Sequence, residues 1–241
     1  MIQTVYTAVA GRVEDFCSSD AIKYVFESST KELLKEILIA GFRDEPNREG
    51  YSALIRRIQS VCDCSAAVMS DTIGSVAYDL YDRKSPEMIQ WSFHLAISLC
   101  PTMSTRNNLA YINRHHRNQL CSSPAEIIDL LIDGVQKQEP FSLINMALTF
   151  VQMLGKEEDW HLADRMIALI REDRSDVRRI VRWWDKLAAE GETEGPLVLQ
   201  WLNRHGKLPT PLSFTQMASI QNLKTSDTQI PRWIFEKYSE T

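Results

Sequence analysis

The sequence predicts an all-α protein built from stacked antiparallel helix hairpins. Three observations support this class. Apolar residues recur at helical spacing through most of the chain, Gly and Pro number only nine each in 241 residues, and a central region divides into three similar helix pairs. A sandwich or barrel would need turn residues far more often. Hydrophobic residues form 44% and charged residues 24% of the chain, so a globular core is expected rather than disorder.

The three helix pairs lie within residues 106–206. They are predicted at 106–117 with 124–137, at 141–154 with 159–172, and at 176–190 with 195–206. A shift of 37 positions aligns Asn108 with Asn145, and a second equal shift reaches Arg182. Small residues stand where the helices of a pair would cross, and these are Ala110, Ala125, Ala147 and Ala163.

Before these pairs, the sequence predicts further helices that begin and end at identifiable residues. Helical spacing of apolar residues over 2–17 and a segment over 20–27 come first. A clearer helix then begins with Ser29 or Thr30 as N-cap and ends at Gly41, before a turn at 44–50. A helix over 51–61 follows the turn.

Serine and proline mark the later helix starts. Ser65 is predicted to cap a helix over 66–82, and Ser85 with Pro86 begins a helix that ends before Pro101. That helix is apolar on most sides, so we expect it to be buried on more than one of them. The same residue pair recurs at Ser123 and Pro124, and another proline begins the helix near residue 140. The predicted organisation is an N-terminal helical region (1–100), the repeats (101–206) and a C-terminal cap (207–241).

Charge and segment composition limit the classes of partner. The formal net charge is −5 and the sequence pI is near 5.6, so no general attraction to nucleic acid or anionic lipid is expected. The first residues lack the positive and apolar regions of a secretory signal, and no apolar run is long enough to span a bilayer. We therefore expect a soluble, cytoplasmic protein.

Cysteine usage agrees with that expectation. The five cysteines are spread through predicted helices, at Cys17, Cys62, Cys64, Cys100 and Cys121. An odd number in this distribution favours reduced, buried thiols over a disulfide framework.

Three short segments carry a family resemblance: NNLAY at 107–111, INMAL at 144–148 and ADRMIALI at 163–170. Their small-residue positions make a region of about 100 residues similar to the tetratricopeptide and Sel1-like class of helix-turn-helix repeats. The resemblance implies an α-solenoid, in which equivalent positions of successive first helices line one concave surface. It also implies that an extended peptide or a terminal carboxylate binds along that surface.

Seven residues are predicted to bind such a partner. Asn108, Asn145, Arg178 and Arg182 would supply amide and guanidinium contacts, and Tyr111, Trp183 and Trp184 would serve as aromatic anchors. The partner is expected to be a protein or peptide, and an acidic one is favoured over nucleic acid. In the alternative interpretation the asparagines are solvated or satisfy loops, the arginines belong to a solvated helix face, and the tryptophans lie in the core.

Two other functions stay open. A small acidic helical protein could neutralise one specific basic partner as a regulatory or immunity-type protein. An enzyme or metal protein could use His115, His116 or His161, although adjacent histidines on a helix point about 100° apart and no metal-binding or nucleophile motif is present. We therefore expect no cofactor and no enzymatic activity, and the sequence does not indicate an oligomeric state.

Overall fold

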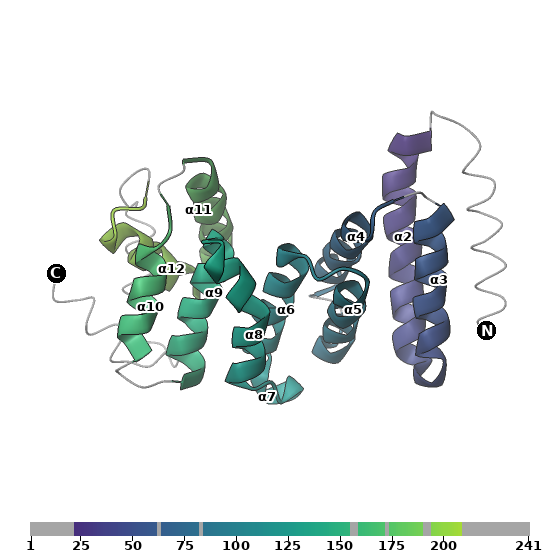
Figure 1. Cartoon of the computed structure of the whole chain (residues 1–241), viewed down its shortest axis with the longest axis horizontal. Helices are drawn as coiled ribbons and strands as arrows, with labels where there is room; N and C mark the ends of the chain where they lie inside the picture. Colours follow the sequence, from purple (N-terminus) through teal and green to yellow (C-terminus); the bar gives the residue numbers. More distant parts are fainter. Residues whose placement is uncertain are drawn as a thin grey trace. The chain divides into compact units, whose positions relative to one another are not determined.

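The computed structural model describes residues 22–61, 64–81, 84–154, 159–171, 174–189 and 194–208, and these ranges contain helices but no strand (Figure 1). The all-α prediction is confirmed for this part of the chain. The helix predicted over 2–17 and almost all of the predicted C-terminal cap lie outside the described residues. By its internal contacts the chain divides into two compact units, Met1–Ser122 and Ser123–Thr241.

The first unit is organised around a central helix, α5. Its elements are α2 (Ile22–Arg43), η1 (Glu45–Asn47), α3 (Arg48–Val61), α4 (Ala66–Asp79), α5 (Pro86–Leu99), α6 (Met103–His115) and α7 (Arg117–Leu120). The α5 helix contacts α2, α4 and α6, and its Ile89, Phe93 and Ala96 are fully buried. The prediction that this apolar helix is buried on more than one side is therefore confirmed.

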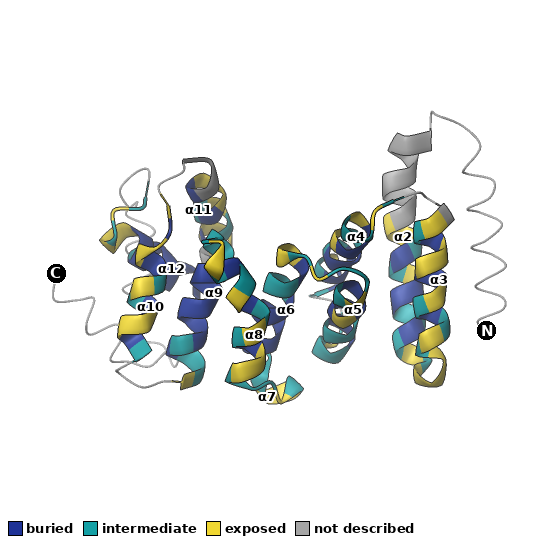
Figure 2. Ribbon diagram, in the orientation of Figure 1, coloured by how far each residue is buried: buried dark blue, intermediate teal, exposed yellow. Residues whose placement is uncertain are grey.

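The second unit has α9 at its centre. It contains α8 (Pro124–Gln136), α9 (Pro140–Thr149), the π-helical segment η3 (Phe150–Leu154), α10 (Asp159–Ala168), α11 (Arg174–Ala189) and α12 (Glu194–Arg204). The α9 helix contacts α8, α10 and α11, and Figure 2 shows it as buried along most of its length. The hydrophobic core of the second unit includes Leu143, Ala147, Trp160, Trp184 and Trp201.

Hydrogen bonds at the helix starts confirm the predicted caps. The Ser65 and Ser85 hydroxyls accept hydrogen bonds from the backbone amides of Val68 and Met88. Ser123 forms a complete capping box, because its hydroxyl accepts from the Glu126 amide while the Glu126 carboxylate accepts from the Ser123 amide. These contacts are local in the sequence, which is why the pattern of residues predicts them.

The predicted helix start at Ser29 or Thr30 is wrong, because both residues lie inside α2, which runs from Ile22 to Arg43 without a break. Gly41 also has another role than the one predicted. It lies inside α2, where an added Cβ would come within 2.8 Å of the Trp91 ring and 3.1 Å of the Tyr51 side chain. Close packing between α2, α3 and α5 therefore explains this glycine, and the helix ends two residues later.

The predicted helix pairs are found in part. The second pair corresponds to α9 with η3 and α10, and the third to α11 and α12, and the helices of each pair are in contact. The first pair is different: α6 belongs to the first unit, where it packs on α4 and α5, and α8 packs on α9 in the second. The division by contacts therefore falls at Ser122, later than the domain boundary predicted at residue 100.

Two smaller expectations also need correction. Ala110, Ala147 and Ala163 are fully buried as expected for helix crossings, whereas Ala125 is exposed. Cys121 is exposed rather than buried and has φ of 52°, and Cys64 and Cys100 are half-buried. Cys17 and Cys62 lie outside the described residues.

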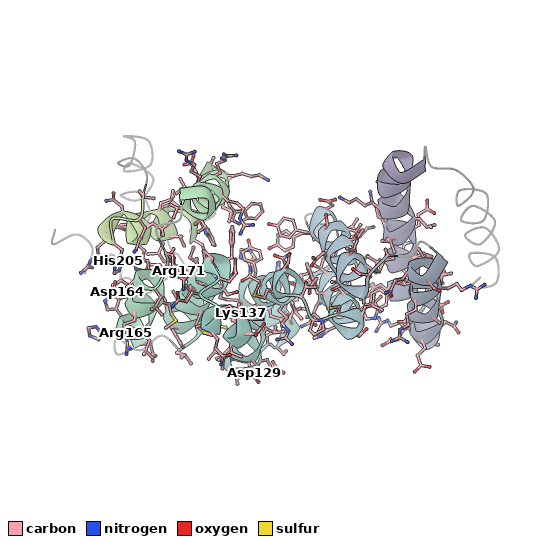
Figure 3. All side chains as sticks on the ribbon, turned by 45° about the horizontal axis from the view of Figure 1, so that its top comes forward. Asp129, Lys137, Asp164, Arg165, Arg171 and His205 are labelled. Atoms are coloured by element: carbon pink, nitrogen blue, oxygen red, sulfur yellow. The ribbon has the colours of Figure 1, made fainter. Side chains whose placement is uncertain are left out.

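A polar contact joins the end of α12 to α10. His205 Nε2 lies 2.8 Å from Asp164 Oδ1, and Figure 3 shows the two side chains next to each other. The following Gly206 has φ of +63°, and the Lys207 amide donates to the Leu202 carbonyl at 2.8 Å. This left-handed turn ends the helix and positions His205 against α10.

Candidate partner-binding surface

The orientation of α11 in the second unit is fixed by its apolar face. Four buried residues at helical spacing point into the core, and these are Val177, Ile180, Trp184 and Leu187. They face α9 and α12, the helices that α11 contacts. The opposite side of α11 is consequently turned to solvent, and it carries most of the helix's charge.

We define the basic-aromatic surface as the outward residues of α11 together with one ring of α9. Its members are Phe141, Arg178, Arg179, Arg182, Trp183 and Lys186. In Figure 3 nitrogen-tipped side chains project from the α11 ribbon. The α11 sequence has five basic residues against two acidic ones, so this surface differs from the acidic average of the chain.

One edge of the surface is held by Arg179. Its guanidinium carbon lies 4.9 Å from the centroid of the Phe141 ring, and its Nη2 lies 3.9 Å from Glu139 Oε1. The Glu139 carboxylate also caps α9, because it accepts hydrogen bonds from the Ser142 amide at 2.6 Å and from the Ser142 hydroxyl at 2.8 Å. Arg179 is thus engaged with the first turn of α9.

Trp183 forms the apolar centre of the surface. It is half-buried against the core, and the Lys186 ammonium lies 5.5 Å from its ring centroid. A partly exposed indole beside cations is the kind of group that supplies contact area in protein interfaces, since Trp and Arg are enriched among residues that dominate binding energy.

Arg178 and Arg182 complete the surface. Both side chains are exposed, and they lie one helical turn apart. Within the part of the chain that the structure describes, neither guanidinium pairs with a carboxylate. In this they differ from Arg179, which contacts Glu139.

The other predicted binding residues lie in other surroundings. Trp184 is 1% exposed and Asn145 is 3% exposed, so both lie in the core of the second unit. Asn108 and Tyr111 belong to α6 in the first unit, and Tyr111 is 7% exposed and stacks on His115 with ring centroids 5.6 Å apart. An exposed ladder of Asn108, Asn145 and Arg182 is not what the structure shows, because Asn145 is buried while Arg182 is exposed.

Helical spacing explains this outcome. Trp184 lies in phase with Ile180 and Leu187 along α11, whereas Trp183 lies in phase with Arg179 and Lys186. Phe141, Arg179 and Lys186 were absent from the predicted set. The spacing of Arg179, Trp183 and Lys186 at i, i+4 and i+7 was the available signal for two of them, but no sequence pattern indicated that Phe141 would lie under Arg179.

The histidines considered for catalysis or metal binding lie in different surroundings. His115 and His116 belong to an aromatic cluster of the first unit, with ring centroids 5.0 Å apart and an interplanar angle of 76°. His116 Nε2 lies 3.0 Å from the Tyr81 hydroxyl, and burial lowers the pKa of His116, with a further decrease from His115 and an opposing increase from Glu87. His161 is exposed on α10. Among the described residues no group of three potential ligands could hold a metal ion.

Comparison with known protein families, curated proteins and solved structures finds no match to this chain. A search of the described helices for one both long and apolar enough to cross a membrane also finds none.

Proposed function

We propose that this protein is a helical interaction module, an adaptor or scaffold whose second unit binds a protein or peptide partner through the basic-aromatic surface. The observation that supports it most strongly is the exposure of Arg178 and Arg182 one turn apart beside the half-buried Trp183. Cations and an indole at one place supply both charge and contact area, as interface centres require. The all-helical architecture is compatible with the stacked hairpins of a repeat protein, which is part of the same proposal.

The test begins with affinity capture from a cell extract at near-physiological salt, followed by purification of the captured protein and titration against the purified chain. We expect the Trp183→Ala variant to weaken binding about tenfold or more, a typical loss for a central interface residue. The matched control is Val68→Ala, which truncates an exposed apolar residue of the first unit. Equal affinity of the purified partner for wild type and Trp183→Ala would contradict the proposal.

A further inference from the structure

The arginines of α11 are not equivalent, and the difference limits what can bind them. Arg179 is engaged by Glu139 and by the Phe141 ring, and Lys186 lies over Trp183. Arg178 and Arg182 have no carboxylate partner in the described ranges. Among the described residues, these two exposed guanidinium groups are the cations of the surface for which neither an ion pair nor a ring contact is found, and their helix positions are about 6 Å apart along the axis.

Two carboxylates lie on or beside the basic-aromatic surface. Glu139 lies beside Arg179, and Asp185 follows Arg182 by three positions, so it lies one turn further along the same exposed side of α11. These carboxylates reduce the net positive charge of the surface beyond the two arginines, so an anion that extends past them with the same charge density gains less attraction there. The surface thus favours a short anionic feature rather than a long one.

This arrangement distinguishes an acidic polypeptide from a nucleic acid. A single strand carries a phosphate at every nucleotide, so its charges cannot be omitted where Asp185 and Glu139 lie. A polypeptide can place two carboxylates opposite Arg178 and Arg182 and neutral or apolar residues elsewhere. The net charge of −5 also opposes a polyanion.

We infer that the occupant of the basic-aromatic surface is an acidic peptide segment that presents two carboxylates about 6 Å apart on one side, next to an apolar residue that packs on Trp183. This inference rests on the proposed function and specifies its partner. Glutamates at positions i and i+4 of a helix provide such a pair. Each guanidinium then donates hydrogen bonds to one carboxylate, and Asp185 sets the direction in which the segment lies.

The test uses labelled helical peptides and fluorescence anisotropy with the full-length chain. One peptide carries Glu at i and i+4 with Leu at i+1, a second has both Glu replaced by Gln, and a third has its Glu residues at i and i+2, on different sides of the helix. We expect the first peptide to bind about tenfold more tightly than the others and the difference to shrink at high salt.

The variant Arg178→Gln/Arg182→Gln should lose this preference, whereas Arg56→Gln/Arg57→Gln, which removes two exposed arginines of α3, should keep it. Arg178→Lys/Arg182→Lys, which retains the charge, should keep part of it and shows that the site still folds. Equal affinity for the Glu and Gln peptides would overturn the inference, and so would the absence of binding by all three peptides. Tighter binding of a single-stranded oligonucleotide, if Arg178→Gln/Arg182→Gln abolishes it, would also overturn the inference. The proposed function fails separately, if Trp183→Ala leaves binding of the captured protein partner unchanged.

Discussion

Trp183 and Trp184 are neighbours in the sequence and point to different sides of α11. Trp184 is 1% exposed and belongs to the core of the second unit, whereas Trp183 is half-buried with Lys186 over its ring. One residue of helix rotates the side chain by about 100°, so two identical residues acquire different roles. Trp184 belongs to the core of the unit, and Trp183 belongs to the basic-aromatic surface.

This separation predicts different consequences for the two truncations. Trp184→Ala should lower the free energy of unfolding by about 3–5 kcal/mol, because it leaves a large cavity between α11, α9 and α12. Trp183→Ala should lower it much less, since part of its surface is already solvated. Urea denaturation followed by circular dichroism measures both, and similar losses for the two variants would contradict the assignment.

Gly134 and Ser142 form a close contact between α8 and α9. A Cβ added at Gly134 would come within 2.6 Å of the Ser142 Cβ and even closer to its hydroxyl, which is bonded to Glu139. Gly134→Ala should therefore lower the free energy of unfolding by about 1–3 kcal/mol through overpacking. Differential scanning calorimetry or urea denaturation measures the loss.

The matched control is the double variant Gly134→Ala/Ser142→Gly, which removes the clashing atoms. Its destabilisation should be smaller than the sum for the single variants, because the two residues interact directly. Strict additivity would show that the contact is absent in solution.

Cys121 adopts the left-handed conformation, with φ of 52°. A residue with a side chain costs about 1 kcal/mol or more there relative to glycine. Cys121→Gly should therefore raise the free energy of unfolding by up to about 1 kcal/mol, while Cys121→Ala, which keeps a Cβ, should not. A Cys121→Gly variant no more stable than Cys121→Ala would indicate a different backbone at this turn.

His116 makes the stability of the first unit depend on pH. Its pKa in the folded protein is lowered chiefly by burial, so the unfolded chain binds more protons between that lowered value and the ordinary pKa of about 6.5. The free energy of unfolding should therefore decrease as the pH falls below that ordinary value, and the contribution is fully present above it. Denaturation of wild type and His116→Gln at pH 7.5 and 5.5 tests this sign.

The variant should show a smaller decrease on acidification than wild type. Glutamine can still hydrogen-bond the Tyr81 hydroxyl, so the comparison separates the effect of protonating His116 from the effect of losing this hydrogen bond. Identical pH dependence in the two proteins would remove His116 as the cause.

Local sequence signals predicted the fold where the controlling contacts are local. The caps at Ser65, Ser85 and Ser123 involve residues three positions apart, and the apolar faces follow from helical spacing. Contacts between residues far apart in the sequence determine the features of the fold that were not predicted. The Trp91 ring lies next to Gly41 inside α2, and α6 packs on α4 and α5 in the first unit. No residue within these helices indicated either contact.

The candidate site was predictable to a similar degree. Arg178, Arg182 and Trp183 were predicted to bind a partner, and in the structure the two arginines are exposed and Trp183 is half-buried beside them. Asn145 was predicted by aligning repeat positions, and such an alignment does not show which face of a helix its neighbours cover. Asn145 is buried because α9 is packed against α8, α10 and α11. Phe141 was missed because it joins the surface only through the packing of α9 on α11.

The central claim is that a partner binds the outward face of α11, and photo-crosslinking tests it most directly. A photoreactive amino acid is introduced in place of Lys186 on the surface and, separately, in place of Val68, an exposed residue of α4. After irradiation in cell extract, we expect the probe at position 186 to capture one partner that wild-type chain displaces, and the probe at position 68 not to capture it. Capture of that partner from position 68 alone, or from neither position, would contradict the account.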